Sequence, residues 1–182
     1  MRKYVALLRG VNVGGKNKLS MKDLKVAFEG RGFLNVRTYI NSGNVIFSSG
    51  SADVSALKSE CENVIRENFG LDIAVAVICA SDFICAVGHA PPWWNADEET
   101  KHNAIFVIAP TTADTVLSDI GQTKPEYEKI GSFGPVIFWS APLKTFSRTR
   151  LSKVVGTGVY NDVTIRNANT ALKITELLRG ED

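Results

Sequence analysis

The sequence predicts an α+β protein of two tandem ferredoxin-like sub-domains with the element order βαββαβ, the second degenerate and followed by an extra C-terminal helix. Three observations support this prediction. Short apolar runs are typical of strands, segments with one apolar face are typical of helices, and the order of elements begins again late in the chain. We expect the first sub-domain at 1–80, a linker containing Pro-Pro-Trp-Trp at 81–102, and the second sub-domain at 103–182.

The first sub-domain shows each element of this order. The predicted elements are a strand at 3–9, a helix from Ser20, a hairpin centred on Asn-Ser-Gly at 41–43, a helix at 53–69 and a strand at 72–78. Ser20 is a typical helix-capping residue, and Gly70 is a typical helix stop. An Asn-Ser-Gly stretch between two segments rich in β-branched residues is a hairpin signal.

The second sub-domain repeats the order with weaker signals. The predicted elements are a short helix at 81–90, a strand at 103–109, a helix at 111–120, a hairpin around 131–135, a helix at 147–155, a short strand at 163–165 and a final helix at 169–178 capped by Asn167 or Asn169. Few residues are identical between the halves, so the repeat rests on element order alone. The alternative is a single α+β domain whose two sheets merge.

Composition narrows the class of protein. Of the 182 residues 45% are hydrophobic and 22% charged, which is ordinary for a globular protein. No apolar stretch is long enough to cross a bilayer, and the apolar run near the N-terminus is too short for a signal peptide. Cys61, Cys79 and Cys85 are odd in number and lie in apolar contexts, as reduced cysteines do. We expect a cytoplasmic protein with no membrane contact, no metal site and no bound cofactor.

Charge is distributed unevenly along the chain. Residues 1–50 carry nine Lys and Arg against two Asp and Glu, whereas residues 51–142 carry five against thirteen. Residues 143–182 carry seven against four, so the formal net charge of +2 conceals a basic first segment. Such a segment creates a local positive field that favours an anionic partner. The alternative is a chance excess of basic residues on solvated helices.

The stretch RGVNVGGKNKLS at 9–20 predicts a loop that faces an anion. Glycines accept positive φ angles, so that several backbone N–H groups can point toward a phosphate, and the following helix N-terminus favours negative charge. The residues expected to bind are Arg9, Asn12, Gly14, Gly15, Lys16 and Lys18. The spacing matches neither the P-loop nor the dinucleotide-binding pattern, so it does not support ATPase or dinucleotide chemistry. The alternative is a glycine turn with exposed lysines.

The hairpin RTYINSGN supplies a second polar cluster. Arg37, Tyr39 and Asn41 would share one strand face, and Asn44 would lie near Arg9, because the first and third strands of a ferredoxin-like order are neighbours. RNA-recognition sheets stack bases on aromatic residues in this way, although their RNP1 pattern is absent here. The same Asn-Ser-Gly-Asn stretch also suits any tight turn.

Two further groups of residues are candidates for binding. Arg148, Arg150 and Arg166 could form a basic edge for phosphate or nucleic acid, or a solvated basic face. Trp93 and Trp94 either fill a seam between the halves or form an exposed wall for a ligand or partner.

Catalytic signals are weak. His102 could supply acid–base chemistry beside the two tryptophans. No G-x-S-x-G or S-x-x-K motif occurs, and neither His89 nor His102 has an evident serine or cysteine partner in the sequence. The sequence therefore predicts no nucleophilic catalysis.

The segments YVALLRGVNVGGKNKLSM, RTYINSGNVIF, HNAIFV and VTIRNANTALK resemble the bacterial family called domain of unknown function 1697, over essentially the whole chain. The L-L-R-G-x-N-V-G-G opening and the Y-I-x-S-G-N-V hairpin are the most specific parts. Ala168 departs from the pattern, because the family often has an aromatic residue between the two asparagines. The resemblance implies a small α+β protein of tandem ferredoxin-like halves, and it brings no catalytic residues, cofactor or established activity.

The function predicted from these patterns is a phosphate-recognising module that binds nucleic acid or a nucleotide through the first loop. One alternative is an enzyme acting on a small phosphorylated substrate, with the same loop as anchor and His102 or a carboxylate as the acid–base group. Another is a protein–protein interaction module that uses Trp93 and Trp94 as an exposed patch.

Overall fold

The chain divides into two compact units. The computed structural model describes residues 1–180. The first unit comprises residues 1–84 together with the segment that begins at Glu176, and the second comprises Cys85–Thr175. Each unit contains one four-stranded antiparallel sheet with helices packed on it, which makes the protein α+β, as predicted.

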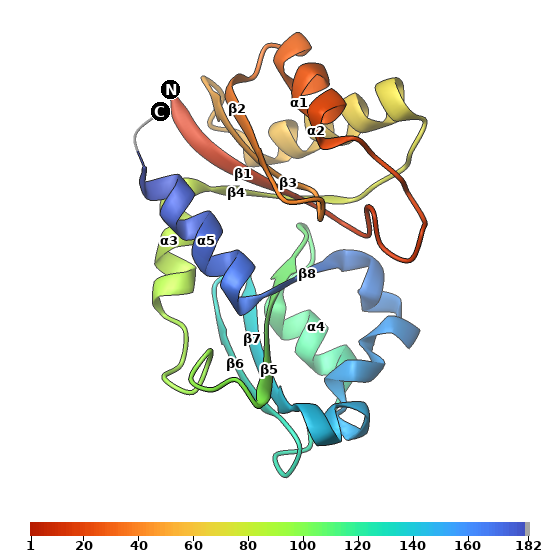
Figure 1. Ribbon diagram of the computed structural model, residues 1–182, viewed down its shortest axis with the longest axis vertical. Helices are drawn as coiled ribbons and strands as arrows, with labels where there is room; N and C mark the ends of the chain where they lie inside the picture. The colour runs from red at the N-terminus through yellow and green to blue at the C-terminus, as the bar shows by residue number, and fades with distance from the viewer. Residues whose placement is uncertain (181–182) are drawn as a thin grey trace. The chain divides into compact units, whose positions relative to one another are not determined.

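The elements of the first unit follow the predicted order. They are β1 (Arg2–Leu8), α1 (Met21–Gly30), β2 (Leu34–Tyr39), β3 (Asn44–Ser49), α2 (Val54–Phe69) and β4 (Val75–Cys79). The strands pair in the order β2-β3-β1-β4, so the first and third strands are neighbours, as expected. Helices α1 and α2 cover the same face of this sheet (Figure 1).

Helix α1 begins, and helix α2 begins and ends, where local signals predict. The Ser20 hydroxyl accepts a hydrogen bond from the Asp23 amide at 3.3 Å, and the Asp53 side chain caps α2 through the Ala56 amide at 3.0 Å. Gly70 ends α2 in the left-handed conformation at φ 65°, where a Cβ would be strained. The capping predictions for Ser20 and Gly70 are therefore confirmed.

The sheet of the first unit is apolar on both faces. The face toward α1 and α2 carries a cluster of rings, in which the Phe33 and Phe47 centroids lie 4.5 Å apart. Alternate residues point to the opposite face, and they are also buried and mostly apolar: Val5, Leu7, Ile46, Ala76 and Ile78. This composition differs from the open face of base-stacking aromatics and cations that RNA-recognition sheets use.

Strand β2 ends before Asn41, which the predicted alternation of strand faces had included. The strand stops at Tyr39, Ile40 has a positive φ of 46°, and Asn41 belongs to the turn. The pairing with β3 also shifts register between Leu34 and Arg37. The prediction that Asn41 shares a strand face with Arg37 and Tyr39 is wrong, because turn geometry replaces the alternation there.

The sheet of the second unit has the same strand order as the sheet of the first unit. Its elements follow α3 (Ala80–Gly88), which spans the division, and are β5 (Thr100–Val107), α4 (Ala113–Ile120), β6 (Lys129–Phe133), β7 (Val136–Pro142), β8 (Val163–Asn167) and α5 (Ala168–Arg179), whose residues from Glu176 onward belong to the first unit. The sheet order is β6-β7-β5-β8, and α4 packs on one face of it (Figure 1). The Asn167 side chain accepts a hydrogen bond from the Thr170 amide at 2.8 Å, which confirms one of the two predicted caps of α5.

The helix predicted at 147–155 does not form. Three short 3₁₀ segments stand there instead: η1 (Leu143–Arg148), η2 (Leu151–Gly156) and η3 (Gly158–Asp162). Thr149 has an extended backbone with ψ 155°, and the Glu128 carboxylate accepts hydrogen bonds from the Arg150 amide at 2.8 Å and the Leu151 amide at 3.1 Å. A side chain from a distant segment thus occupies two amides that a continuous helix would use for its own hydrogen bonds.

Two further observations concern residues 1–180. None of the helices in this range has the length and apolar character that a bilayer crossing requires. Within the same range, no three His, Cys, Asp or Glu side chains gather in a way that could hold a metal ion.

Candidate functional site

The glycine-rich loop folds as a very small β-hairpin. Gly14 and Gly15 occupy its tip with φ values of 58° and 76°, and the Lys16 amide donates to the Val13 carbonyl at 3.1 Å. Two successive positive φ angles are the signature of a type I′ turn, which explains why two glycines stand together. The tip and both lysines after it are exposed.

Asn12 holds this hairpin against its surroundings. Its side-chain oxygen accepts from the Leu19 amide at 2.8 Å, and its side-chain nitrogen donates to the Leu19 carbonyl at 2.9 Å and the Asn41 carbonyl at 2.8 Å. Its own amide donates to the Asn17 carbonyl at 3.2 Å. The bond to Asn41 brings together the two polar clusters that the sequence indicated.

The backbone donors of the loop are arranged differently from the prediction. We expected its amides to point outward toward an anion, but those of Asn12, Lys16 and Leu19 all donate to acceptors within the loop. These three amides therefore close the hairpin, and the loop holds its shape through its own backbone and the Asn12 side chain. For an anion beside the loop, the exposed lysines and the start of α1 also supply partners.

A hollow of about 580 Å³ lies beside the loop in the first unit. Its lining residues come from the loop, the start of α1 and the β2–β3 turn: Asn12, Gly15, Lys18, Leu19, Ser20, Met21, Lys22 and Asn41. Met21 and Lys22 are the first two residues of α1, and the N–H groups at such positions have no partner within the helix. The hollow thus combines helix N-terminal donors with two exposed lysines.

The other predicted residues of the first unit lie around this region. The Arg9 amide donates to the Ala74 carbonyl at 3.0 Å, and its side chain is half-buried. Arg37 is exposed on the edge strand β2. Asn44 is fully buried, and its side-chain nitrogen donates to the Tyr39 carbonyl at 2.9 Å, so it stabilises the turn from inside.

The three predicted arginines of the second unit occupy three different environments. The Arg150 Nε donates to the last carbonyl of α4, where it acts as a C-terminal cap. Arg148 is exposed above the Tyr127 ring. Arg166 is buried, donates to the Thr164 hydroxyl at 2.8 Å, and loses hydration, which lowers its pKa to about 10. Only Arg148 presents its side chain as the predicted basic edge requires.

The two tryptophans also differ. Trp94 is buried, its Nε1 donates to the Asn103 carbonyl at 2.8 Å, and its ring packs edge-on against Phe138 with centroids 5.1 Å apart. Trp93 is half-buried. An exposed patch made of both rings is therefore excluded, because Trp94 belongs to the core of the second unit.

His102 has partners that the sequence analysis missed. Its Nδ1 lies 2.6 Å from the Ser140 hydroxyl, and its Nε2 lies 3.0 Å from the Asp97 carbonyl oxygen. The prediction that neither histidine has a serine or cysteine partner is wrong for both, because His102 contacts Ser140 and the Cys85 Sγ lies 3.8 Å from His89 Nδ1. His102 and Ser140 face each other on β5 and β7, 38 residues apart, and no local pattern reveals such a register.

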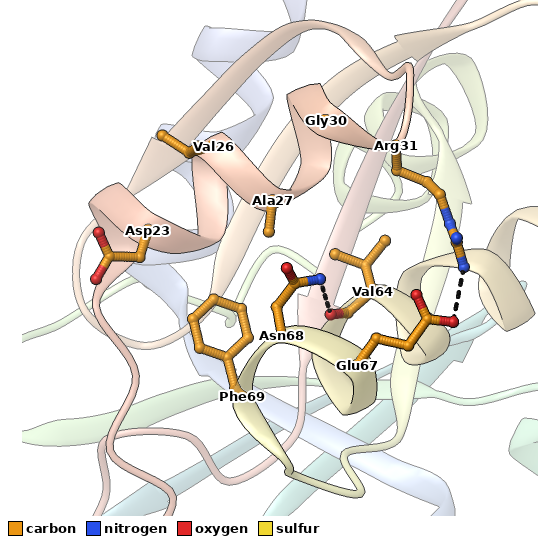
Figure 2. A pocket seen from close by; sticks show the side chains of 9 residues that line it. All are labelled: Asp23, Val26, Ala27, Gly30, Arg31, Val64, Glu67, Asn68 and Phe69. Carbon is orange, nitrogen blue, oxygen red and sulfur yellow. Dashed lines mark hydrogen bonds and ion pairs between the residues drawn. The ribbon is translucent and has the colours of Figure 1, made fainter.

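A larger hollow, of about 660 Å³, separates the exposed sides of α1 and α2 (Figure 2). Arg31 and Glu67 form an ion pair at its edge at 3.3 Å, and the Asn68 side chain donates to the Val64 carbonyl at 2.8 Å. None of the predicted site residues lines it. Arg31 and Glu67 neutralise each other, and the groove gathers no group of side chains that points to a particular chemistry.

The comparisons with known proteins agree with this architecture. An α+β protein with two four-stranded antiparallel sheets is the class that the fold defines. The family model described as "Protein of unknown function (DUF1697)" matches residues 1–138, and the chain belongs to this family, as its motifs predicted. The solved structure of the conserved bacterial protein SP0830 from Streptococcus pneumoniae is similar, with 29% identity and a TM-score of 0.86 over 98% of this chain and 99% of that one. No curated protein matches the chain.

Proposed function

We propose that this protein is a phosphate-recognising module that binds nucleic acid or a nucleotide at the hollow beside the start of α1. One observation carries the proposal: the hollow gathers Asn12, Gly15, Lys18 and Asn41, which come from two separate predicted clusters. Lys22 and the first turn of α1 line the same space.

The chemistry of this hollow suits an anion. The first N–H groups of a helix point out of its N-terminus, and the helix dipole adds positive potential there. The Ser20 hydroxyl is already bound to the Asp23 amide, so the donors that remain are those of Met21 and Lys22. Lys18 and Lys22 are exposed and can add charge-assisted hydrogen bonds to phosphate oxygens.

The charge at the hairpin tip favours a polymeric or extended ligand over one isolated phosphate. Lys16 projects from the exposed tip beside the hollow, and residues 1–50 carry the basic excess of the chain. A chain of phosphates could contact Lys16, Lys18 and Lys22 in succession. Affinity of this kind depends on counterion release and therefore falls steeply with salt.

We also infer that the two units are ferredoxin-like and arose by duplication. The matching strand orders β2-β3-β1-β4 and β6-β7-β5-β8 support this inference, with η1, η2 and η3 in the place that α2 holds in the first unit. Free cysteines, one of them exposed, fit a reducing cytoplasmic environment.

The test measures the fluorescence anisotropy of a labelled single-stranded RNA and of a labelled ATP analogue between about 50 and 200 mM salt. Changing Lys18→Ala together with Lys22→Ala should weaken binding and reduce the salt slope by about two, because each lysine neutralises about one phosphate. The matched control, Lys144→Ala with Arg179→Ala, removes two exposed charges elsewhere. Equal weakening in both double variants, or an affinity that does not depend on salt, would contradict the proposal.

A further inference from the structure

The second unit contains a hydrogen-bonded chain that the phosphate site does not use. Ser140, which is 2% exposed, contacts His102 Nδ1 at 2.6 Å, and His102 Nε2 contacts the Asp97 carbonyl at 3.0 Å. The Asp97 carboxylate lies 4.0 Å from the same Nε2. A serine hydroxyl, an imidazole and a backbone carbonyl thus form a hydrogen-bonded chain, and a carboxylate lies close to its far end.

The partners of the imidazole determine where its proton lies. A carbonyl oxygen can only accept, so the bond to Asp97 places the hydrogen on Nε2. With hydrogen on Nε2, a neutral imidazole has its lone pair on Nδ1, where it can accept a hydrogen bond from the Ser140 hydroxyl. This is the arrangement in which a histidine serves as general base to a serine and a third group orients the ring.

The sheet register adds a cation on the other side of the serine. Ser140 on β7 is paired with His102 on β5 and with Lys129 on β6. Residues directly opposite one another in antiparallel strands point to the same face, with Cβ atoms about 4.5–5.5 Å apart. His102, Ser140 and Lys129 therefore stand side by side on one face of the sheet.

A small cavity of about 170 Å³ opens onto this row. Ser140, Lys129, Asp97 and Thr100 line it together with aromatic residues Trp93 and Tyr127. Thr100 donates a hydrogen bond to the Asp97 carboxylate, which is the main reason that the pKa of Asp97 lies below its usual value and the group is charged at neutral pH. The cavity thus brings aromatic rings, the Ser140 hydroxyl and Lys129 together, and the carboxylates of Asp97, Glu126 and Glu128 share its lining.

We propose that Ser140 is the nucleophile of an acyl-transfer site that hydrolyses small carboxylic esters, with His102 as general base and Asp97 as the residue that positions it. The size of the cavity limits the acyl group to a short chain. This site lies in the second unit and goes beyond the proposed phosphate recognition.

The reaction balances with water as the only co-reactant. The Ser140 oxygen attacks the ester carbonyl carbon while its proton passes to His102 Nδ1. The ester C–O bond then breaks, and the leaving alcohol takes that proton. Water next gives a proton to Nδ1 and attacks the acyl-serine, and the carboxylic acid leaves as Ser140 recovers its proton. Lys129 stabilises the negative charge that develops on the carbonyl oxygen in both halves.

The first experiment treats the unmodified protein with diisopropyl fluorophosphate and maps the adduct by peptide mass spectrometry. We expect one adduct, on Ser140, because an activated serine reacts where an ordinary hydroxyl does not. No adduct on Ser140, or adducts spread over other serines, would overturn the proposal. This measurement needs no variant, so it decides the question even if a substitution unfolds the protein.

The second experiment follows hydrolysis of p-nitrophenyl acetate. Ser140→Ala and His102→Gln should each lower the rate by about 100-fold or more, the usual effect of losing a nucleophile or general base. The matched control Ser147→Ala removes an exposed hydroxyl in η1 and should keep the full rate. If Ser140→Ala and Ser147→Ala hydrolyse the ester equally fast, Ser140 is only a hydrogen-bond partner of the buried histidine.

Discussion

The side-chain amide of Asn12 pairs with the backbone of Leu19 in both directions, as two strands would. Its Oδ1 accepts from the Leu19 amide at 2.8 Å, and its Nδ2 donates to the Leu19 carbonyl at 2.9 Å and to the Asn41 carbonyl at 2.8 Å. One side chain thereby joins the base of the glycine-rich hairpin to the β2–β3 turn. The position and shape of the proposed phosphate site depend on this contact.

Asn12→Asp should destabilise the protein by about 1–3 kcal/mol, because the new carboxylate oxygen replaces a donor and faces two carbonyl oxygens. Asp tolerates the positive φ of 55° at this position, so backbone strain does not enter. Urea unfolding gives the change in free energy. The matched control is Asn17→Asp, which removes one exposed hydrogen bond of 3.1 Å to Gly10 and should cost much less. Equal costs would show that the double pairing with Leu19 adds nothing.

Gly43→Ala should cost about 3 kcal/mol, which combines left-handed strain with overpacking. A Cβ at Gly43, with φ 74°, would lie 2.5 Å from Val11 Cγ2 and 2.7 Å from Leu8 Cβ. Gly70→Ala is the control, since Gly70 has a similar φ of 65° and nothing within 4 Å of the added Cβ. We expect about 1 kcal/mol for the control. The difference between the two midpoints of thermal unfolding measures the steric part, and a difference near zero would contradict the packing argument.

Glu128→Gln should destabilise the second unit by about 1.5–3 kcal/mol, the range for hydrogen bonds to a charged group. The buried carboxylate accepts from the amides of Lys124, Arg150 and Leu151. Amide hydrogen exchange should accelerate most at Arg150 and Leu151, where η2 begins. Glu126→Gln, an exposed neighbour, should leave both stability and exchange unchanged. Unchanged exchange in Glu128→Gln would mean that another interaction holds η2.

The stability of the protein should fall above about pH 8.5 because of Cys61. Burial, and secondarily the charges of Glu62 and Glu60, raises the pKa of the Cys61 thiol far above its usual value. The unfolded chain releases this proton near about pH 8.5, whereas the folded protein retains it, so the stabilisation is complete below that pH and declines above it. The expected slope is about 1.4 kcal/mol per pH unit.

Cys61→Ala provides the reference for that measurement. Its free energy of unfolding should lack this part of the pH dependence, so the difference between the two proteins should shrink as the pH rises from about 8.5 to 9.5. Urea unfolding at each pH gives both curves. Parallel curves would show that the thiol ionises equally easily in the folded and unfolded states.

Local signals in the sequence predicted most of the secondary structure. The Ser20 cap, the Gly70 stop and the Asn167 cap depend on residues within three or four positions of each other, and all three are confirmed. The glycine pair at 14–15 correctly indicated a site of positive φ. The helix predicted at 147–155 does not form because of a long-range interaction. The groups that prevent it include Glu128, which lies about twenty residues away.

The candidate sites show the same difference between local and long-range interactions. The basic loop and its glycines were recognised from adjacent residues, but the sequence could not reveal that Asn12 would use its side chain to bind Leu19 and Asn41. The contact of His102 with Ser140 was missed altogether, because it depends on how β5 and β7 align. Strand register is set by the packing of a whole sheet and leaves no local pattern.

The sequence by itself determined the α+β class, the family and the basic character of the first fifty residues. It also determined the order of strands and helices along the first half of the chain and the order of strands along the second half. Only the tertiary structure decided which amides of the loop are occupied, which arginines are buried, and which serine stands beside His102. The physical reason is range: caps, turns and periodicity are interactions between near neighbours in the chain, whereas burial and hydrogen-bond partners depend on segments that meet only when the sheets form.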